Sequence, residues 1–157
     1  MRQEGRTEVD EPDVGAPIAG FDRTTVELSR EEGMRLLAGV PFGRIVFTRN
    51  ALPAVRPVRH LIDGELLIVR ADVGSGFSQS VRNDRSVVIA YEADDIDVDR
   101  RLGWSVVVTG LAHPVTAPAL VHRYSARLGS WIGADDQLIA VEPTLITAIA
   151  LAEVTAA

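Results

Sequence analysis

The chain has 157 residues, of which 46% are hydrophobic and 24% charged, and its formal net charge is −6. This size predicts a single domain with a substantial core, and the acidic balance argues against a general nucleic-acid-binding protein. The absence of cysteine excludes disulfides and thiolate catalysis, and because no apolar run reaches the roughly 20 residues that span a bilayer, we expect a cytoplasmic protein without a membrane partner.

The N-terminal part of the chain divides into a tail and the start of a folded domain. Residues 1–22 are rich in acids, proline and glycine without periodicity, so we predict a disordered tail there and one domain over residues 23–157. Ser29 is followed three residues later by Glu32, which is the pattern of a capping box. A short amphipathic helix is therefore expected to begin at Ser29 and to end at Gly39.

The rest of the chain reads as strands with a few short helices between them. Asp63-Gly64 predicts a two-residue hairpin, and helical spacing predicts helices over Pro118–Leu128 and Phe77–Asn83. Apolar, β-branched runs bounded by turn residues predict strands, which we place at residues 44–48, 54–62, 66–70, 86–91, 104–115, 137–141 and 145–151. The alanine-rich last run also fits a helix. Six or seven strands with short inserted helices predict a mainly β protein, an antiparallel barrel rather than a βαβ sheet.

One short strand carries two guanidinium groups and an imidazole, in the segment Arg56-Pro57-Val58-Arg59-His60. Alternation puts Arg56 and Arg59 on opposite faces unless Pro57 marks a bulge, and the proline places the segment at an edge or rim. An exposed edge with arginine beside it can offer backbone groups to a planar heterocycle and charge to its phosphate. Because the chain contains no lysine, any phosphate clamp must use arginine, backbone N–H or hydroxyl groups. Two ordinary surface arginines on an edge strand are the alternative.

Three other motifs have both a functional and a structural interpretation. Gly74-Ser75-Gly76 before a helix is either a phosphate cradle or a plain turn. Gly103-Trp104-Ser105 opens the longest strand, where the indole either lines a flavin or caps the barrel. The acids between Glu92 and Asp99 favour a solvated loop over a calcium site, because their spacing lacks the glycine and glutamate of an EF-hand. The three histidines lack zinc-ligand spacing, so we expect no metal.

In this order the segments resemble the flavin-binding split-barrel family related to pyridoxamine 5′-phosphate oxidase. The resemblance rests on Met34-Arg35-Leu36-Leu37, Gly43-Arg44-Ile45-Val46-Phe47, Arg56-Pro57-Val58-Arg59-His60, Asp63-Gly64, Gly74-Ser75, Val87-Val88-Ile89-Ala90-Tyr91-Glu92 and Gly103-Trp104-Ser105-Val106-Val107-Val108-Thr109-Gly110. It implies a six- to seven-stranded antiparallel split β-barrel of Greek-key topology with short accessory helices. It further implies a homodimer that binds FMN, or the deazaflavin F420, at the subunit interface.

The resemblance also implies a set of cofactor-binding residues. Carried over one by one, Arg56, Pro57, Val58, Arg59 and His60 line the isoalloxazine and phosphate, Arg70 and Ala71 continue the site, Ser75 touches phosphate, and Trp104 and Ser105 match the motif without an assigned role. The chain departs from the family where Gly76 replaces a usual lysine, where Ala71 replaces a usual hydroxyl, and where Thr147-Ala148-Ile149 lacks a Gly-Arg pair. Each lost charge-assisted contact weakens binding by about 1.5–3 kcal/mol.

Two hypotheses of different classes follow. The first is an FMN- or F420-dependent oxidoreductase of unknown substrate, in which the cofactor transfers hydride and the protein binds and orients it. The second is a non-catalytic homodimer that kept the fold and lost tight cofactor binding, which the glycine at position 76 favours. No acid–base residue stands out in the sequence, so we assign no catalytic residue.

Overall fold

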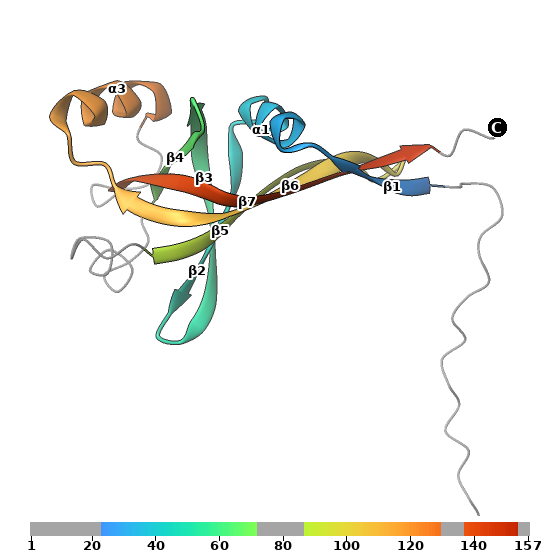
Figure 1. Cartoon of the computed structure of the whole chain (residues 1–157), viewed down its shortest axis with the longest axis horizontal. Coiled ribbons are helices and arrows are strands. Elements are labelled where there is room, and N and C mark those ends of the chain that lie inside the picture. The colour runs from blue at the N-terminus through green and yellow to red at the C-terminus, as the bar shows by residue number, and fades with distance from the viewer. Residues whose placement is uncertain (1–22, 72–86, 130–136, 154–157) are drawn as a thin grey trace, which may run out of the picture.

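A computed structural model describes residues 23–71, 87–129 and 137–153 of the chain (Figure 1). Within these ranges the chain is mainly β, with seven strands and two helices. In chain order they are β1 (Arg23–Leu28), α1 (Arg30–Ala38), β2 (Phe42–Arg49), β3 (Leu52–Asp63), β4 (Leu66–Ala71), β5 (Val87–Asp97), β6 (Leu102–Pro114), α3 (Pro118–Leu128) and β7 (Gln137–Glu153). The expected tail over residues 1–22 and the expected helix over Phe77–Asn83 lie outside the described residues.

Six of the described strands close into an antiparallel barrel. Their order around it is β2, β3, β4, β7, β6 and β5, and β5 pairs again with β2. β5 follows the β2–β3–β4 hairpins in the chain and returns to lie beside β2, which makes the spatial order β5-β2-β3-β4 a Greek key. β1 pairs with the C-terminal part of β7 and extends the sheet beyond the barrel. The predicted fold class, an antiparallel split β-barrel, is confirmed.

The core lies inside the barrel, and a smaller cluster lies under α3. Alternation along β2, β5 and β6 sends Ile45, Ile89, Tyr91, Val106 and Val108 inward, where each is fully or almost fully buried. On the outer side of β3, β4 and β7, three apolar side chains pack against α3. The members of this second cluster are Leu61, Ile68, Leu138, Tyr124 and Leu128.

Helix α1 is held by the predicted capping box and by a close contact with β7. The Glu32 backbone N–H donates to Ser29 Oγ (3.2 Å), and the Ser29 N–H donates to the Glu32 carboxylate (2.9 Å). At Gly33 the helix backbone lies so near β7 that an added Cβ would stand 2.9 Å from the Cβ of Ala148. A larger side chain at position 148 would therefore displace α1 from the sheet.

Four details of the predicted elements are wrong. The two closing strands form one strand, β7, in which Pro143 lies opposite Gly110 at a shift of register. Proline is tolerated there because an irregular ladder does not need its N–H. The hairpin turn is one residue later than predicted, since Asp63 still pairs with Leu66. Arg23–Leu28 forms a strand that its polar sequence did not indicate, and β5 continues through Asp97 where a solvated loop was expected.

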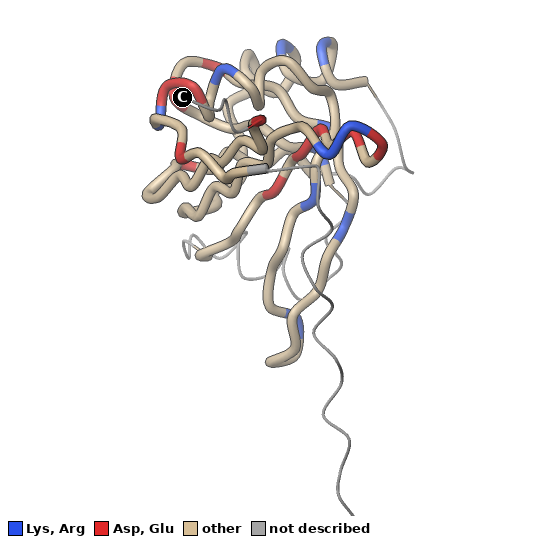
Figure 2. Tube along the Cα trace, turned by 90° about the vertical axis from the view of Figure 1, so that its right-hand side faces the viewer, with Lys and Arg blue, Asp and Glu red and all other residues tan. Residues whose placement is uncertain are grey.

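The β2–β3 hairpin reaches beyond the barrel as an arm, which we define as residues 47–58, with Phe47 and Val58 at its base still buried in the core. Within the described residues, β5 pairs with β2 only at residues 44–46 and β4 pairs with β3 only at residues 59–63, so the arm strands pair with each other. Asn50 and Ala51, both with positive φ, close its turn. Figure 2 shows the arm standing away from the rest of the molecule, with basic but no acidic positions along it. No helix of the described ranges is long and apolar enough to cross a membrane.

Candidate functional site

The predicted cofactor-binding segment lies where the arm leaves the barrel. Pro57 pairs with Arg44 and Arg56 with Ile45 in an unbroken register, so the proline does not mark a bulge. No described strand pairs with residues 52–58 of β3 on the side away from β2. Among the residues that the structure describes, the backbone groups of this stretch that point away from β2 therefore form a free edge, as the proline predicted.

Arg56 and Arg59 lie on opposite faces of β3, as the alternation predicted. Arg56 shares its face with Val58, which is buried in the barrel, but its own side chain is exposed because the arm has left the core. Its Nη1 donates to the carbonyl of Val55 at 2.9 Å. The guanidinium therefore sits against the backbone of the free edge, with further N–H groups directed elsewhere.

His60 lies in the core, where its two ring nitrogens are both hydrogen-bonded. Its side chain is 6% exposed. Nε2 lies 2.7 Å from the carbonyl oxygen of Leu37, which can only accept, so Nε2 carries the hydrogen. Nδ1 then accepts from the Tyr91 hydroxyl at 2.5 Å. Burial lowers the pKa of His60 and raises that of Tyr91. With both ring nitrogens engaged inside the protein, the His60 ring has no free polar atom for a ligand on β3.

Arg59 and Arg70 lie side by side on the outer face of the sheet. Arg59 of β3 is directly paired with Arg70 of β4. Leu61 and Ile68 lie next to them on the same face and pack under α3. Arg59 Nη1 donates to the carbonyl of Leu128 in the last turn of α3 at 2.7 Å. This bond satisfies one of the carbonyls that a helix leaves open at its C-terminus, and it fixes α3 to the predicted cofactor strand.

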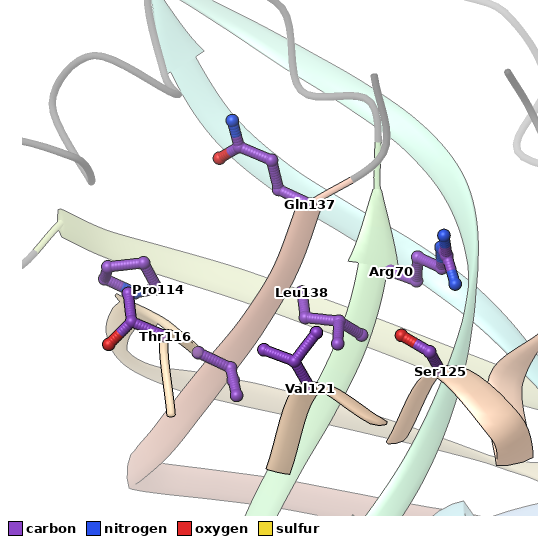
Figure 3. A pocket seen from close by; sticks show the side chains of 8 residues that line it. Arg70, Pro114, Thr116, Val121, Ser125, Gln137 and Leu138 are labelled. Atoms are coloured by element: carbon purple, nitrogen blue, oxygen red, sulfur yellow. The ribbon is translucent and has the colours of Figure 1, made fainter. Parts of the chain in front are cut away.

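A cavity of about 360 Å³ opens beside Arg70, between α3 and the ends of β4, β6 and β7 (Figure 3). Figure 3 shows the Arg70 guanidinium and the Ser125 hydroxyl on one side of it and the apolar side chains of Val121 and Leu138 on its floor. Its lining residues are Arg70, Pro114, Val115, Thr116, Val121, Ser125, Gln137 and Leu138. With one cation, two hydroxyls, one carboxamide and no described carboxylate, this lining suits an anionic or hydroxyl-rich group with an apolar body.

The structure does not bring all of the predicted site residues together. Ala71 points into the barrel and is 2% exposed, so only its backbone is available, and Ser75 lies outside the described residues. Trp104 and Ser105 begin β6, whereas Pro114 at its other end lines the cavity. Ten residues of strand separate these positions by roughly 30 Å. Within one chain they therefore belong to a different place from Arg70.

The sequence did not single out the residues that fix α3. Asp63 accepts from the Tyr124 hydroxyl at 2.5 Å and also from the Arg123 guanidinium. The Tyr124 hydrogen bond, followed by the charge of Arg123, keeps the pKa of Asp63 below its usual range. The helical spacing that predicted Pro118–Leu128 assigned no role to the Tyr124 hydroxyl. Its bond to the hairpin depends on a contact 61 residues away, which no local pattern encodes.

The outer face of β5, β6 and residues 142–151 of β7, beyond the part of β7 that α3 covers, has no helix packed on it in the described part of the chain. Val88 and Leu145 are 63% and 60% exposed there, and the ladder places Val107, Thr109 and Leu111 between them. At its border Arg44 donates to both the Glu92 and Asp94 carboxylates, at 2.9 and 3.0 Å. A contiguous apolar face of this kind on a sheet is typical of an interaction surface.

No group of three histidine or acidic side chains that could hold a metal ion occurs in the described ranges. Three of the acids of β5 are instead engaged singly or in pairs. Glu92 and Asp94 bind Arg44, and Asp97 accepts from the Arg100 N–H at 2.9 Å in the turn that follows.

The chain matches a family model described as pyridoxamine 5′-phosphate oxidase over residues 29–157. It is 52% identical, over 130 residues, to the uncharacterized protein Rv0080 of Mycobacterium tuberculosis, an alignment that covers 81% of this chain and 86% of that protein. Both the family model and this relative span most of the described barrel.

Two solved structures share the fold. The FAD binding protein from Mycobacterium smegmatis is 28% identical, with a TM-score of 0.60, covering 81% of this chain and 98% of that one. A protein from Corynebacterium glutamicum, named as a candidate pyridoxamine 5′-phosphate oxidase, is 22% identical with a TM-score of 0.67 and the same coverage of both chains. At 22% identity, the similarity to the Corynebacterium glutamicum protein supports the fold assignment and nothing further.

Proposed function

This chain belongs to the pyridoxamine 5′-phosphate oxidase family, and from that membership and the geometry of β3 we propose that it binds a flavin nucleotide and acts as a flavin-dependent oxidoreductase. The observation that carries the proposal is the free edge of β3 beside the exposed Arg56 guanidinium. The name of the Mycobacterium smegmatis relative, an FAD binding protein, supports the same cofactor class.

The residues present fit a flavin in two respects. The free edge over residues 52–58 can hydrogen-bond the polar rim of an isoalloxazine ring mainly through backbone carbonyl groups, because Pro53 and Pro57 have no N–H to donate. The Arg56 guanidinium, which donates one described bond to a neighbouring carbonyl, has N–H groups left for a phosphate and can bind it in a bidentate manner. We propose FMN as the nucleotide, with F420 and FAD as the alternatives that the test must separate.

The cavity beside Arg70 is the proposed place for the substrate or for the polar chain of the cofactor. Arg70 pairs with Arg59, which is three residues from Arg56 and so roughly 10 Å along β3. A bound flavin would supply hydride transfer to or from the substrate. The Arg70 guanidinium would pair with a negative charge on the bound group, and the Ser125 hydroxyl would donate a hydrogen bond to a substrate oxygen. The apolar side chains of Val121 and Leu138 would exclude water from the cavity.

We propose that a second copy of the chain covers the helix-free outer face of β5, β6 and residues 142–151 of β7. The exposed Val88 and Leu145 favour an apolar partner surface, and the two-fold symmetry usual in dimers pairs such a face with itself. A dimer would also give Trp104 and Ser105, which lie far from the cavity of their own chain, a way to contribute to a site between subunits. We expect Val88→Glu to yield monomers in analytical ultracentrifugation and Leu120→Glu, on α3, to leave the dimer intact. A monomeric wild type would contradict this proposal.

A non-catalytic dimer is the second candidate, because two cations usual in the family are missing. Gly76 stands in place of a lysine. Position 148 is 3% exposed and packed against Gly33 of α1, so this position has no room for an arginine side chain. Phosphate binding would then depend on arginines of β3 and β4 alone.

The proposal is tested by titrating purified protein, freed of bound cofactor, with FMN, FAD and F420 while following cofactor fluorescence. Saturable binding of a flavin with a dissociation constant in the micromolar range or below supports it. Bleaching of the bound flavin by a hydride donor would then support the oxidoreductase activity. If none of the three binds, the non-catalytic alternative takes its place. The cytoplasmic location and the absence of a nucleic-acid or membrane partner stay predictions.

A further inference from the structure

One buried hydrogen-bond chain joins the proposed flavin strand to two other elements. It runs from the Tyr91 hydroxyl on β5 to Nδ1 of His60 on β3, and from Nε2 of His60 to the carbonyl of Leu37 in α1. The two rings meet edge to face, with centroids 5.2 Å apart. The backbone N–H of His60 also donates to the carbonyl of Pro41 at 3.1 Å. His60 therefore ties β3 to α1, to the α1–β2 connection and to β5.

The anchor sits directly beside the segment proposed to bind flavin. Val58 is the last residue of the arm, and Arg59 and His60 are the first residues of β3 that also belong to the barrel. Arg59 is fixed on the outer face by Leu128 of α3, and His60 on the inner face by Tyr91 and Leu37. These two attachments hold β3 at the point where the arm leaves the barrel.

The hydrogen-bond chain is complete in only one protonation state of His60. With a neutral ring, Tyr91 donates to Nδ1, and Nε2–H donates to Leu37, so every polar hydrogen has an acceptor. A proton added to Nδ1 occupies the lone pair that accepted from Tyr91. The Tyr91 hydroxyl hydrogen must then find another acceptor inside a core where Tyr91 is fully buried.

A proton can reach the ring, because His60 also lines a cavity of about 350 Å³ between the C-terminal ends of α1 and α3. Among its other lining residues, Arg127 of α3 is the charged one. Tyr91 is the titratable group that faces the ring from β5, and α1 presents the carbonyl of Leu37. A carboxylate beside the ring would stabilise protonated His60. Neither Arg127 nor Tyr91 provides such a negative charge.

We propose that His60 is a positioning residue whose neutral form holds the free edge of β3 ready for the flavin, so that protonation of this one ring weakens flavin binding. The inference rests on the proposed function. Burial lowers the pKa of His60 in the folded protein, which agrees with a site built for the neutral ring.

The test compares flavin affinity at about pH 8 and at the lowest pH at which the protein stays folded, because burial places the pKa of His60 below the ordinary histidine value. We expect the affinity of the wild type to fall about tenfold, the equivalent of one hydrogen bond. His60→Gln can donate and accept along the same line but cannot be protonated, so its affinity should change less than twofold. His122→Gln, which removes an exposed histidine of α3, should behave as the wild type does. Because the FMN phosphate itself titrates, the decisive quantity is the ratio between variants.

A second measurement follows the flavin-free wild type by NMR. The backbone amides of Arg56, Val58 and Arg59 should titrate together with the His60 ring, and they should not titrate in His60→Gln. Equal pH dependence of flavin binding in wild type and His60→Gln, or amides that ignore the His60 titration, would overturn the inference. If the wild type binds no flavin at either pH, the proposed function fails. The amide titration alone then decides whether His60 positions this edge.

Discussion

The substitution Tyr91→Phe tests the buried hydrogen-bond chain with little other change to the core. The phenylalanine ring keeps the apolar contacts of Tyr91 in the barrel, so no cavity forms. What is lost is the 2.5 Å hydrogen bond to Nδ1 of His60, which leaves a buried acceptor unsatisfied. Such a loss costs about 1–3 kcal/mol of unfolding free energy. In a chain of this length, each kcal/mol lowers Tm by roughly 3 °C.

Urea unfolding provides the assay, and Tyr124→Phe provides a matched control. Tyr124 is also buried, and its hydroxyl also donates over 2.5 Å, but its acceptor Asp63 keeps Arg123 and contact with water. The control should therefore cost less than about 1 kcal/mol. The urea midpoint of Tyr91→Phe should fall without a change in the slope. A loss no larger than that of Tyr124→Phe would refute the assignment of a satisfied, water-free chain.

Three further predictions concern the same strands. Because the pKa of His60 is lowered on folding, the folded state favours the neutral ring. Its contribution to stability is then complete above about pH 6.5 and is lost as the pH falls below that value, a loss that His60→Gln should reduce in urea titrations between pH 8 and pH 5. Gly43→Ala should lower the unfolding free energy by about 1–3 kcal/mol, because the added Cβ would meet the Tyr91 hydroxyl and lie 2.5 Å from the Glu92 carbonyl oxygen. Gly39→Ala, the control, meets no comparable clash. Equal losses of stability for the two variants in thermal melts would contradict the packing described. Arg59→Ala should speed hydrogen exchange in the last turn of α3 about fivefold by removing the bond to Leu128, and Arg127→Ala should not; the same rate in both variants would show that Arg59 does not hold the helix.

The sequence predicted those features that local physics decides. Ser29 and Glu32 are close enough in the chain to form their capping box before any tertiary contact exists. Alternation placed Arg56 and Arg59 on opposite faces of β3, and the family resemblance supplied the order of strands that alternation cannot give. The sequence did not predict β1, because Arg23–Leu28 is a strand only through its pairing with residues 148–153 of β7. Because of Pro143, two strands were predicted where β7 is one, whereas in the sheet the opposing Gly110 accommodates the proline.

The candidate site was predictable as a motif but not as a geometry. His60 was expected beside the cofactor, and its pairing with Tyr91 depends on two strands brought together across 31 residues. The residues that line the cavity beside Arg70 come from β4, β6, β7 and α3, so no continuous segment of the sequence predicts it. Ser125 and Thr116 could have been suggested only by a correct placement of α3 over the sheet. Which residues share a site therefore followed from the barrel closure rather than from any spacing.

The most direct test of the central claim compares the FMN affinity of wild type, Arg56→Ala and Arg35→Ala by isothermal titration calorimetry. Arg35 is an exposed arginine of α1, remote from the free edge of β3. We predict that Arg56→Ala weakens binding about ten- to a hundredfold, the value of a charge-assisted contact to phosphate. Arg35→Ala should bind as the wild type does. Equal affinities in all three proteins would contradict the assignment of the β3 edge as the flavin site.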